Sequence, residues 1–159
     1  MYTLIMYYSF TGRTHYEARR LCEKLDAEVY EVREQKHRSL WSAYLFGPAQ
    51  AKSRKTVVVE PIAVNLEDYD KLVIMCPVWG GYPAPAFNTI VRELPIGLEV
   101  EIVLTSDSGK AKDLSKLKAR VELQGVHVTG VRVIKTEDLK KREKRYRKRL
   151  KAEEKNGQE

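Results

Sequence analysis

The sequence predicts an α/β protein with a doubly wound parallel sheet and helices on both faces. Short apolar runs recur along the chain, as is typical of strands that are buried on both faces. Between them lie stretches whose apolar residues are spaced i, i+3, i+4 and i+7, the pattern of a helix that packs on a sheet. The two patterns alternate, which favours parallel strands joined by helical crossovers.

Each element can be assigned to a segment. Strands are expected at residues 2–8, 28–33, 71–76, 99–105 and 126–134. Helices are expected from the turn after the first strand to residue 25, and at 40–46, 87–94, 111–121 and from 137 onward. We expect Gly47-Pro48 to bend or end the second helix, and Pro77 to end the third strand. Residues 57–64, interrupted by Pro61, should be extended and irregular.

Length and charge define the domain organisation. A chain of 159 residues is the size of one domain with one core. The formal net charge is +7, and residues 140–151 alone carry nine Lys or Arg and one Glu. We therefore divide the chain into a domain at 1–136 and a basic C-terminal helix and tail at 137–159. The tail is either a solvated helix face or a patch for an acidic partner or an anionic surface. Nucleic acid is an unlikely partner because Tyr146 is the tail's single aromatic residue.

The N-terminal apolar run, the cysteines and the histidines indicate neither a membrane-spanning protein, nor a disulfide-bonded one, nor a metalloprotein. The N-terminal apolar run is too short to span a bilayer, so no transmembrane segment is expected and the default location is the cytoplasm. Cys22 and Cys76 lie in apolar patterns and should be reduced packing residues. The histidines are dispersed at positions 15, 37 and 127, and the carboxylates are scattered. We therefore predict no metal site and no catalytic side chain, and any activity would come from a cofactor.

The first strand ends in the turn Ser9-Phe10-Thr11-Gly12-Arg13-Thr14, which opens a helix. Its hydroxyl groups can donate to phosphate oxygens, and the first N–H groups of the helix attract an anion. The turn lacks the Lys-Ser/Thr ending of a nucleoside-triphosphate loop and the three glycines of a dinucleotide loop. The alternative interpretation is a polar helix cap made by Ser9 or Thr11.

Two more loops follow strands of the predicted sheet, at the edge where parallel sheets bind ligands. After the third strand come Trp79 and Tyr82, whose flat faces could stack on a heterocycle, with Gly80 and Gly81 between them. After the fourth strand, residues 105–109 can donate hydrogen bonds. The alternatives are a core position for Trp79, a solvated Tyr82 and ordinary helix capping by the third loop.

The three loops, in this order, resemble the FMN-binding loops of flavodoxins over roughly residues 1–135. The resemblance implies a three-layer sandwich with a five-stranded sheet in the order 2-1-3-4-5. It also implies FMN as the cofactor, with its phosphate on the first turn and its ring between the other two loops. The implied cofactor-binding residues are Ser9, Phe10, Thr11, Gly12, Arg13, Thr14, Pro77, Val78, Trp79, Gly80, Gly81, Tyr82, Ser106, Asp107, Ser108 and Gly109.

The resemblance implies an electron carrier that serves a redox partner protein. One alternative is an FMN-dependent oxidoreductase that uses NAD(P)H and a quinone or similar acceptor, and another is a binding module that has lost FMN. The chain departs from typical flavodoxins because it is basic and because its third loop has no aromatic residue. One face of the flavin would then be open, or be covered by the aromatic segment at residues 41–46 of the same chain or of a partner subunit in a homodimer.

Overall fold

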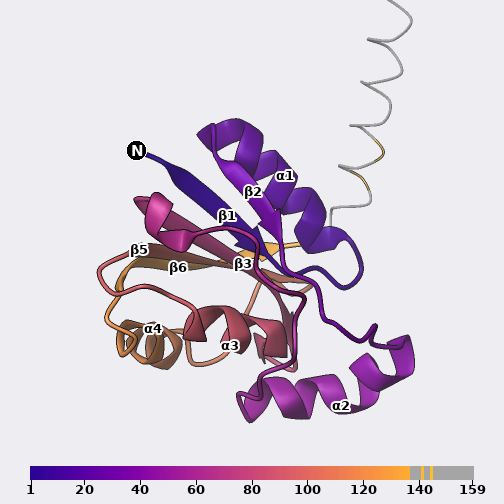
Figure 1. The fold of residues 1–159 in the computed structure, drawn as a ribbon. Coiled ribbons are helices and arrows are strands. Elements are labelled where there is room, and N and C mark those ends of the chain that lie inside the picture. Colours follow the sequence, from indigo (N-terminus) through magenta and orange to yellow (C-terminus); the bar gives the residue numbers. More distant parts are fainter. Residues whose placement is uncertain (137–140, 142–143, 145–159) are drawn as a thin grey trace, which may run out of the picture.

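The computed structural model describes residues 1–136, 141 and 144, and its sheet has the predicted topology (Figure 1). Five parallel strands pair in the order β2-β1-β3-β5-β6. Their bounds are Thr3–Tyr7 for β1, Glu28–Glu31 for β2, Lys71–Trp79 for β3, Glu99–Ser106 for β5 and His127–Lys135 for β6. The two-residue strand β4, Tyr82–Pro83, pairs antiparallel with the end of β3. Among the parallel strands the predicted order 2-1-3-4-5 is confirmed.

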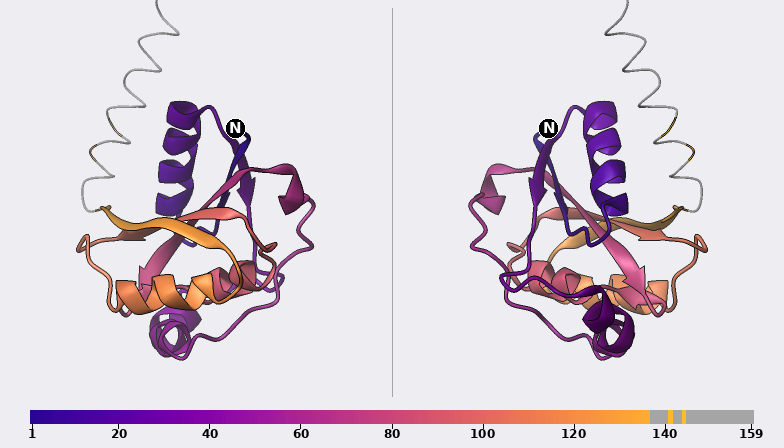
Figure 2. Two further views of the ribbon diagram at one scale, coloured as in Figure 1. Left: turned by 90° about the vertical axis from the view of Figure 1, so that its left-hand side faces the viewer. Right: turned by 90° about the vertical axis from the view of Figure 1, so that its right-hand side faces the viewer.

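Helices cover both faces of the sheet, as predicted (Figure 2). Helix α1, Arg13–Leu25, lies on one face, and α3, Pro85–Arg92, and α4, Leu114–Glu122, lie on the other. Helix α2, Leu40–Lys52, lies outside the α3 and α4 layer. A short 3-10 helix spans Leu66–Asp68. The helix and tail predicted from residue 137 onward lie outside the described residues.

The core has two parts because successive residues of a strand point to opposite faces of the sheet. On the α1 side, Ile5, Val73 and Val103 pack with Ala18. On the other side, a larger cluster surrounds Phe87. Cys76 belongs to this larger cluster, and burial raises the pKa of its thiol. Cys22 packs against the smaller cluster, so both cysteines are free and have packing positions, as the sequence predicts.

Helix α2 does not end at Gly47-Pro48 but continues to Lys52. A proline inside a helix removes one backbone hydrogen bond. Tertiary packing fixes the helix here: a Cβ at Gly47 would lie 2.9 Å from Cε3 of Trp79, and one at Gly80 would lie 2.7 Å from Cβ of Pro48. Gly47-Pro48 is thus the close contact between α2 and the β3–β4 hairpin. In the described part of the chain, no helix has the length and apolar character needed to cross a membrane.

Strand β3 continues past Pro77 to Trp79, so the prediction that Pro77 ends it is wrong. Pro77 is in register with Thr105 of β5, and its carbonyl accepts a hydrogen bond from the N–H of Ala84 at 2.9 Å. Trp79 then pairs with Tyr82 across a tight hairpin. The strand therefore turns back on itself beyond the proline, which fixes the loop that contains Gly80 and Gly81.

Candidate functional site

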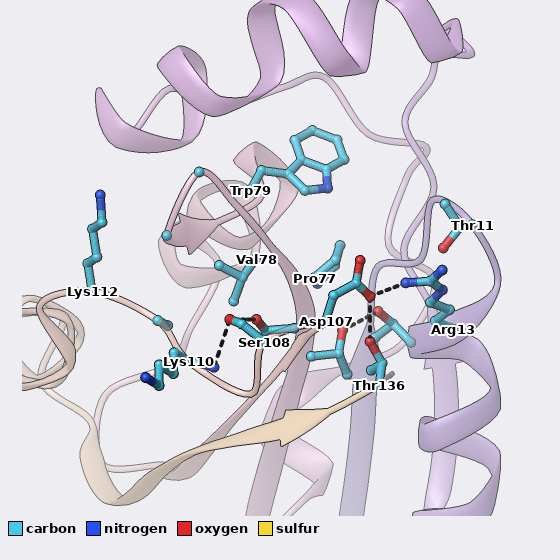
Figure 3. Close-up of a pocket in the computed structure, with 16 residues that line it drawn as sticks. Thr11, Arg13, Pro77, Val78, Trp79, Asp107, Ser108, Lys110, Lys112 and Thr136 are labelled. Carbon is cyan, nitrogen blue, oxygen red and sulfur yellow. Dashed lines mark hydrogen bonds and ion pairs between the residues drawn. The ribbon is translucent and has the colours of Figure 1, made fainter. Parts of the chain in front are cut away.

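A pocket of about 680 Å³ lies where strands β1, β3 and β5 end (Figure 3). All three loops singled out from the sequence contribute to it, and one more residue follows β6. The lining residues are Thr11, Arg13, Thr14, Pro77, Val78, Trp79, Gly80, Gly81, Thr105, Ser106, Asp107, Ser108, Lys110, Ala111, Lys112 and Thr136. The carboxyl ends of neighbouring parallel strands meet at one edge, which is why segments far apart in the sequence form one site.

The first loop leaves the start of helix α1 open to an anion. Gly12 is the N-cap residue, has a positive φ of 91°, and makes no side-chain cap hydrogen bond. Its N–H donates to Oγ of Ser9 at 3.1 Å, which shapes the turn. The alternative of a side-chain cap by Ser9 or Thr11 is therefore not observed. The first N–H groups of an uncapped helix carry partial positive charge, so this end of the pocket favours a negatively charged group.

Polar contacts join the first loop to the third. The Arg13 guanidinium donates to Oδ1 of Asp107, and the Thr136 hydroxyl donates to the same oxygen at 2.9 Å (Figure 3). The hydroxyl groups of Thr14 and Thr105 are hydrogen-bonded at 2.8 Å, and both residues are buried. Thr14 therefore holds two strand ends together, whereas Thr11 has an exposed position at the pocket.

Trp79 lies at the edge of the pocket and also packs against the core. Its ring makes edge contacts with Tyr8 and Phe10, at centroid distances of 6.1 and 5.7 Å. The guanidinium carbon of Arg38 lies 5.3 Å from the ring centroid. Trp79 therefore lines the pocket and also has a core position, while its stacking on a cofactor stays a prediction. A ring held on several sides is preorganised, and it offers the pocket only the part of its surface that these neighbours leave open.

Five of the residues singled out from the sequence do not line this pocket. Ser9 and Gly12 are hydrogen-bonded to each other within the first loop, Phe10 packs against Trp79, and Gly109 lies against Lys135. Tyr82 faces a neighbouring pocket, where its hydroxyl donates to Asp113 at 3.3 Å. Although Trp79 and Tyr82 are paired in the β3–β4 hairpin, Trp79 contacts Phe10 and Arg38, whereas Tyr82 contacts Asp113.

Sequence reasoning missed Lys110, Ala111, Lys112 and Thr136. Thr136 could have been found, since it follows the fifth parallel strand at the same sheet edge. No sequence pattern predicts Lys112 as a pocket residue. Its position is fixed by its backbone N–H, which donates to the Gly81 carbonyl at 2.7 Å. Lys110 and Lys112 lie on the opposite side of the pocket from Thr11 and Arg13 (Figure 3).

The aromatic segment of α2 does not line the pocket of its own chain. Trp41 is 74% exposed and Tyr44 is 78% exposed. The hypothesis that this segment covers a ligand within one chain is therefore unsupported. A cover supplied by a second subunit stays a prediction.

The described residues hold no cluster of metal-ligating side chains. Within this part of the chain, no three His, Cys, Asp or Glu side chains come together as a metal site. His15 is hydrogen-bonded through Nδ1 to the Tyr7 hydroxyl. Burial, with the Glu31 charge as the next cause, raises the pKa of Tyr7 to about 12. Tyr7 is therefore a neutral phenol at physiological pH.

Comparisons with known proteins identify similar structures. No family model and no curated protein matches the sequence. A flavoprotein from Lactobacillus acidophilus NCFM, crystallised in complex with FMN, is 25% identical, with a TM-score of 0.71 over 88% of this chain and 97% of that one. The apo-form of the flavoprotein from the same organism is 26% identical, with a TM-score of 0.66 over 83% and 91%. Two-electron reduced flavodoxin from Megasphaera elsdenii is 16% identical, with a TM-score of 0.56 over 84% and 86%.

Proposed function

The chain has a flavodoxin-like fold, and from this premise we propose that it binds FMN noncovalently and carries electrons to or from a redox partner protein. The observation that carries the proposal is the convergence of three loops on one pocket. Each loop follows a different strand, and each matches in order a loop that holds FMN in flavodoxins. The FMN complex of the Lactobacillus acidophilus flavoprotein supports the choice of cofactor.

The phosphate end of the pocket fits FMN. Thr11 offers an exposed hydroxyl, Gly12 lets the backbone approach closely, and α1 begins without a side-chain cap. Hydroxyl and backbone donors with a helix dipole bind a phosphate dianion without a lysine. Arg13 adds a cation, although its guanidinium is paired with Asp107. The phosphate is thus recognised mainly by neutral donors.

The opposite end of the pocket suits a flat heterocycle. Val78 and the free part of Trp79 provide apolar surface, and Gly80 and Gly81 have no side chains to block the ring edge. The third loop brings the hydroxyl groups of Ser106 and Ser108, which are hydrogen-bonded to each other at 3.1 Å. The volume of about 680 Å³ is within the usual range for small-molecule pockets, about 300–1,000 Å³.

The bound cofactor would supply the redox chemistry, and the residues of this chain would bind and orient it. The first loop fixes one end through the phosphate. Trp79 is held by its packing against Phe10 and Arg38, so it excludes water from one side of the ring with little loss of side-chain entropy. Backbone donors of the second and third loops are held by the strand ends, so their positions are set before the cofactor enters.

The test is a titration of the purified, flavin-free chain with FMN, followed by flavin fluorescence. We expect saturable binding with one FMN per chain. Thr11→Val removes one phosphate donor and should weaken FMN binding about tenfold, because a hydrogen bond to a charged group is worth about 1.5–3 kcal/mol. The same variant should bind riboflavin, which has no phosphate, as tightly as the wild type does.

Thr129→Val is the matched control, since Thr129 is an exposed threonine on β6 outside the pocket. It should leave the affinity for FMN unchanged. Absence of saturable FMN binding by the wild-type chain would contradict the proposal. It would instead favour a flavodoxin-like binding module that has lost its cofactor.

A second candidate function, an FMN-dependent oxidoreductase, is favoured by the third loop. Residues 106–109 carry no aromatic side chain, and Lys110 and Lys112 line the pocket beyond them. The third loop without aromatic side chains leaves space for an anionic electron donor, and the two lysines would attract it. Rapid bleaching of the FMN-loaded chain by NADPH or NADH without a reductase would support the enzyme, and bleaching that needs an added reductase would support the carrier.

A further inference from the structure

A second pocket of about 160 Å³ lies beside the first, and Lys112 lines both. Three elements enclose the second pocket. They are the end of α2, the β3–β4 hairpin at Tyr82 and Pro83, and the first turns of α4. A small pocket between three elements suits a compact chemical group better than the flat surface of a protein partner.

The second pocket is strongly basic. Five cationic side chains line it, from Lys52, Arg54, Lys112, Lys116 and Arg120. The single carboxylate of the lining is Asp113, which accepts a hydrogen bond from the Tyr82 hydroxyl. None of the five cations forms an ion pair with a carboxylate in the described part of the chain. The lining therefore has a formal excess of four positive charges.

Two guanidinium groups of this lining are close enough to repel each other. Arg120 is half-buried and lies over the Phe87 ring, with its guanidinium carbon 5.9 Å from the ring centroid. Burial, followed by the charge of Arg54, lowers the pKa of Arg120. Arg54 is exposed, but Arg120 is half-buried, and a half-buried cation beside a like charge is unfavourable without an anion nearby. An anion in this pocket would relieve the repulsion.

The backbone around this pocket is also unusual. Arg54 and Asp113 have positive φ angles of 56° and 54°, and only one other non-glycine residue in the described part does. Residues with side chains rarely adopt this conformation, and such positions are frequent at ligand sites. Arg54 follows Ser53, the C-cap residue of α2, and Asp113 is the N-cap residue of α4, so both conformations lie where these elements border the pocket.

We propose that the second pocket binds the phosphate group of an anionic small molecule that reaches the first pocket past Lys112. The chemistry recognised is a phosphate dianion, which can accept hydrogen bonds from several cations at once. Its source is either the 2′-phosphate of NADP(H) or free inorganic phosphate. The assignment to NADP(H) as an electron donor rests on the second candidate function proposed above, the FMN-dependent oxidoreductase, whereas the phosphate site does not.

The experiment measures binding to the full-length chain by calorimetry in a phosphate-free buffer, with NADP⁺, NAD⁺ and sodium phosphate as ligands. We expect NADP⁺ to bind at least about tenfold more tightly than NAD⁺, since only NADP⁺ has a phosphate for the basic pocket. The difference should disappear in Arg120→Gln and in Arg54→Gln. Arg54 is exposed, so its variant should fold even if the half-buried Arg120 cannot be replaced.

Lys118→Gln is the matched control, because it removes one cation from α4 outside the pocket. It should keep the preference for NADP⁺. Equal binding of NADP⁺ and NAD⁺ by the wild type would overturn the nucleotide as the source. Failure of the Arg54 and Arg120 variants to weaken both NADP⁺ and phosphate would overturn the phosphate site itself.

The measurement is made with and without saturating FMN, which separates this inference from the proposed function. NADP⁺ selectivity without any FMN binding would support the second pocket and contradict the cofactor. FMN binding without NADP⁺ selectivity and without phosphate binding would support the cofactor and contradict the second pocket. Added salt should weaken NADP⁺ binding more than NAD⁺ binding, because the selective contact is ionic.

Discussion

At the scale of single residues, Asp107 has the clearest influence on the proposed phosphate site. Its carboxylate accepts from the Arg13 guanidinium at the first loop and from the Thr136 hydroxyl, which follows β6. A carboxylate here repels a phosphate dianion and occupies a cation that could otherwise attract it. The Asp107–Arg13 contact, which joins the third loop to the first, should therefore weaken phosphate binding.

We predict that Asp107→Asn tightens FMN binding. Asparagine keeps an oxygen that can accept from Thr136, removes the negative charge and releases Arg13. One unit of charge at the edge of a solvated site is worth about 1 kcal/mol, so the dissociation constant should fall roughly fivefold. The measurement is the fluorescence titration with FMN at low and at high salt, where the gain should shrink as screening increases.

Riboflavin is the control ligand, because it lacks the phosphate that Asp107 would repel. Its affinity should be the same for the wild type and for Asp107→Asn. Tighter binding of riboflavin as well would mean that Asp107 acts on the ring or on loop geometry. Weaker FMN binding would mean that the ion pair with Arg13 is needed to shape the site.

Residues of the site differ in how far the sequence predicts their positions. Thr11, Trp79 and Asp107 lie at or shortly after the ends of β1, β3 and β5, and all three line the pocket. Tyr82 has the same residue type and spacing as a stacking aromatic, yet the two-residue strand β4 turns it toward Asp113. A strand of two residues shows no alternation of apolar and polar side chains, so its effect on side-chain direction cannot be deduced from the sequence.

At the scale of elements, one cluster of charges crosses three neighbouring strands. Glu101 of β5 accepts from Nζ of Lys71 in β3 at 2.8 Å and from Nε of Arg132 in β6 at 3.0 Å. Burial alone would raise the pKa of Glu101, but the hydrogen bonds and charges of Lys71 and Arg132 outweigh it. The pKa of the carboxyl is therefore below its usual value.

We predict that this cluster stabilises the fold at neutral pH but not in acid. A carboxyl whose pKa is lower in the folded chain contributes stability above its unfolded pKa of about 4.3. The contribution is lost as the pH falls through the folded pKa. Glu101→Gln should lower the free energy of unfolding by about 1–2 kcal/mol at pH 7. Once the pH is below the folded pKa, the variant and the wild type should be almost equal, as measured by urea unfolding over a series of acid pH values.

Glu99→Gln provides the comparison within the same strand. Glu99 forms no ion pair with the described residues, so its variant should change stability little at pH 7 or in acid. If Glu101→Gln were equally destabilising at pH 7 and below the folded pKa, the effect would come from packing. The cross-strand charges would then contribute no measurable stability.

Elements of the fold were predictable where apolar periodicity is strong. Strands β1, β3 and β5 and the stripes of α1 and α3 fall where the pattern places them. The differences are clearest at proline: α2 continues through Pro48, where a bend or an end was expected, and β3 continues through Pro77, where its end was expected. In both places contacts from distant segments compensate for the missing N–H, and such contacts are not visible in a local pattern.

At the scale of the whole molecule, the proposed cofactor would join loops from three strands. The first and third loops already share the contacts of Thr14 and Asp107, while the second loop is held by α2 and Lys112. FMN would bridge these loops at the open edge of the sheet. Because the strands behind them belong to one sheet, a ligand at this edge should stabilise the entire domain.

This coupling predicts how FMN changes thermal unfolding. A ligand at about one hundred times its dissociation constant adds about 2.7 kcal/mol if it binds only the folded chain. For a chain of this size, the unfolding midpoint should rise by roughly 5–11 °C. Riboflavin at the same concentration should raise it less, since it cannot use the first loop. The midpoint is read from circular dichroism, which follows the whole backbone. An equal shift with both ligands would mean that the phosphate loop contributes nothing to binding, despite the open start of α1 beside Thr11.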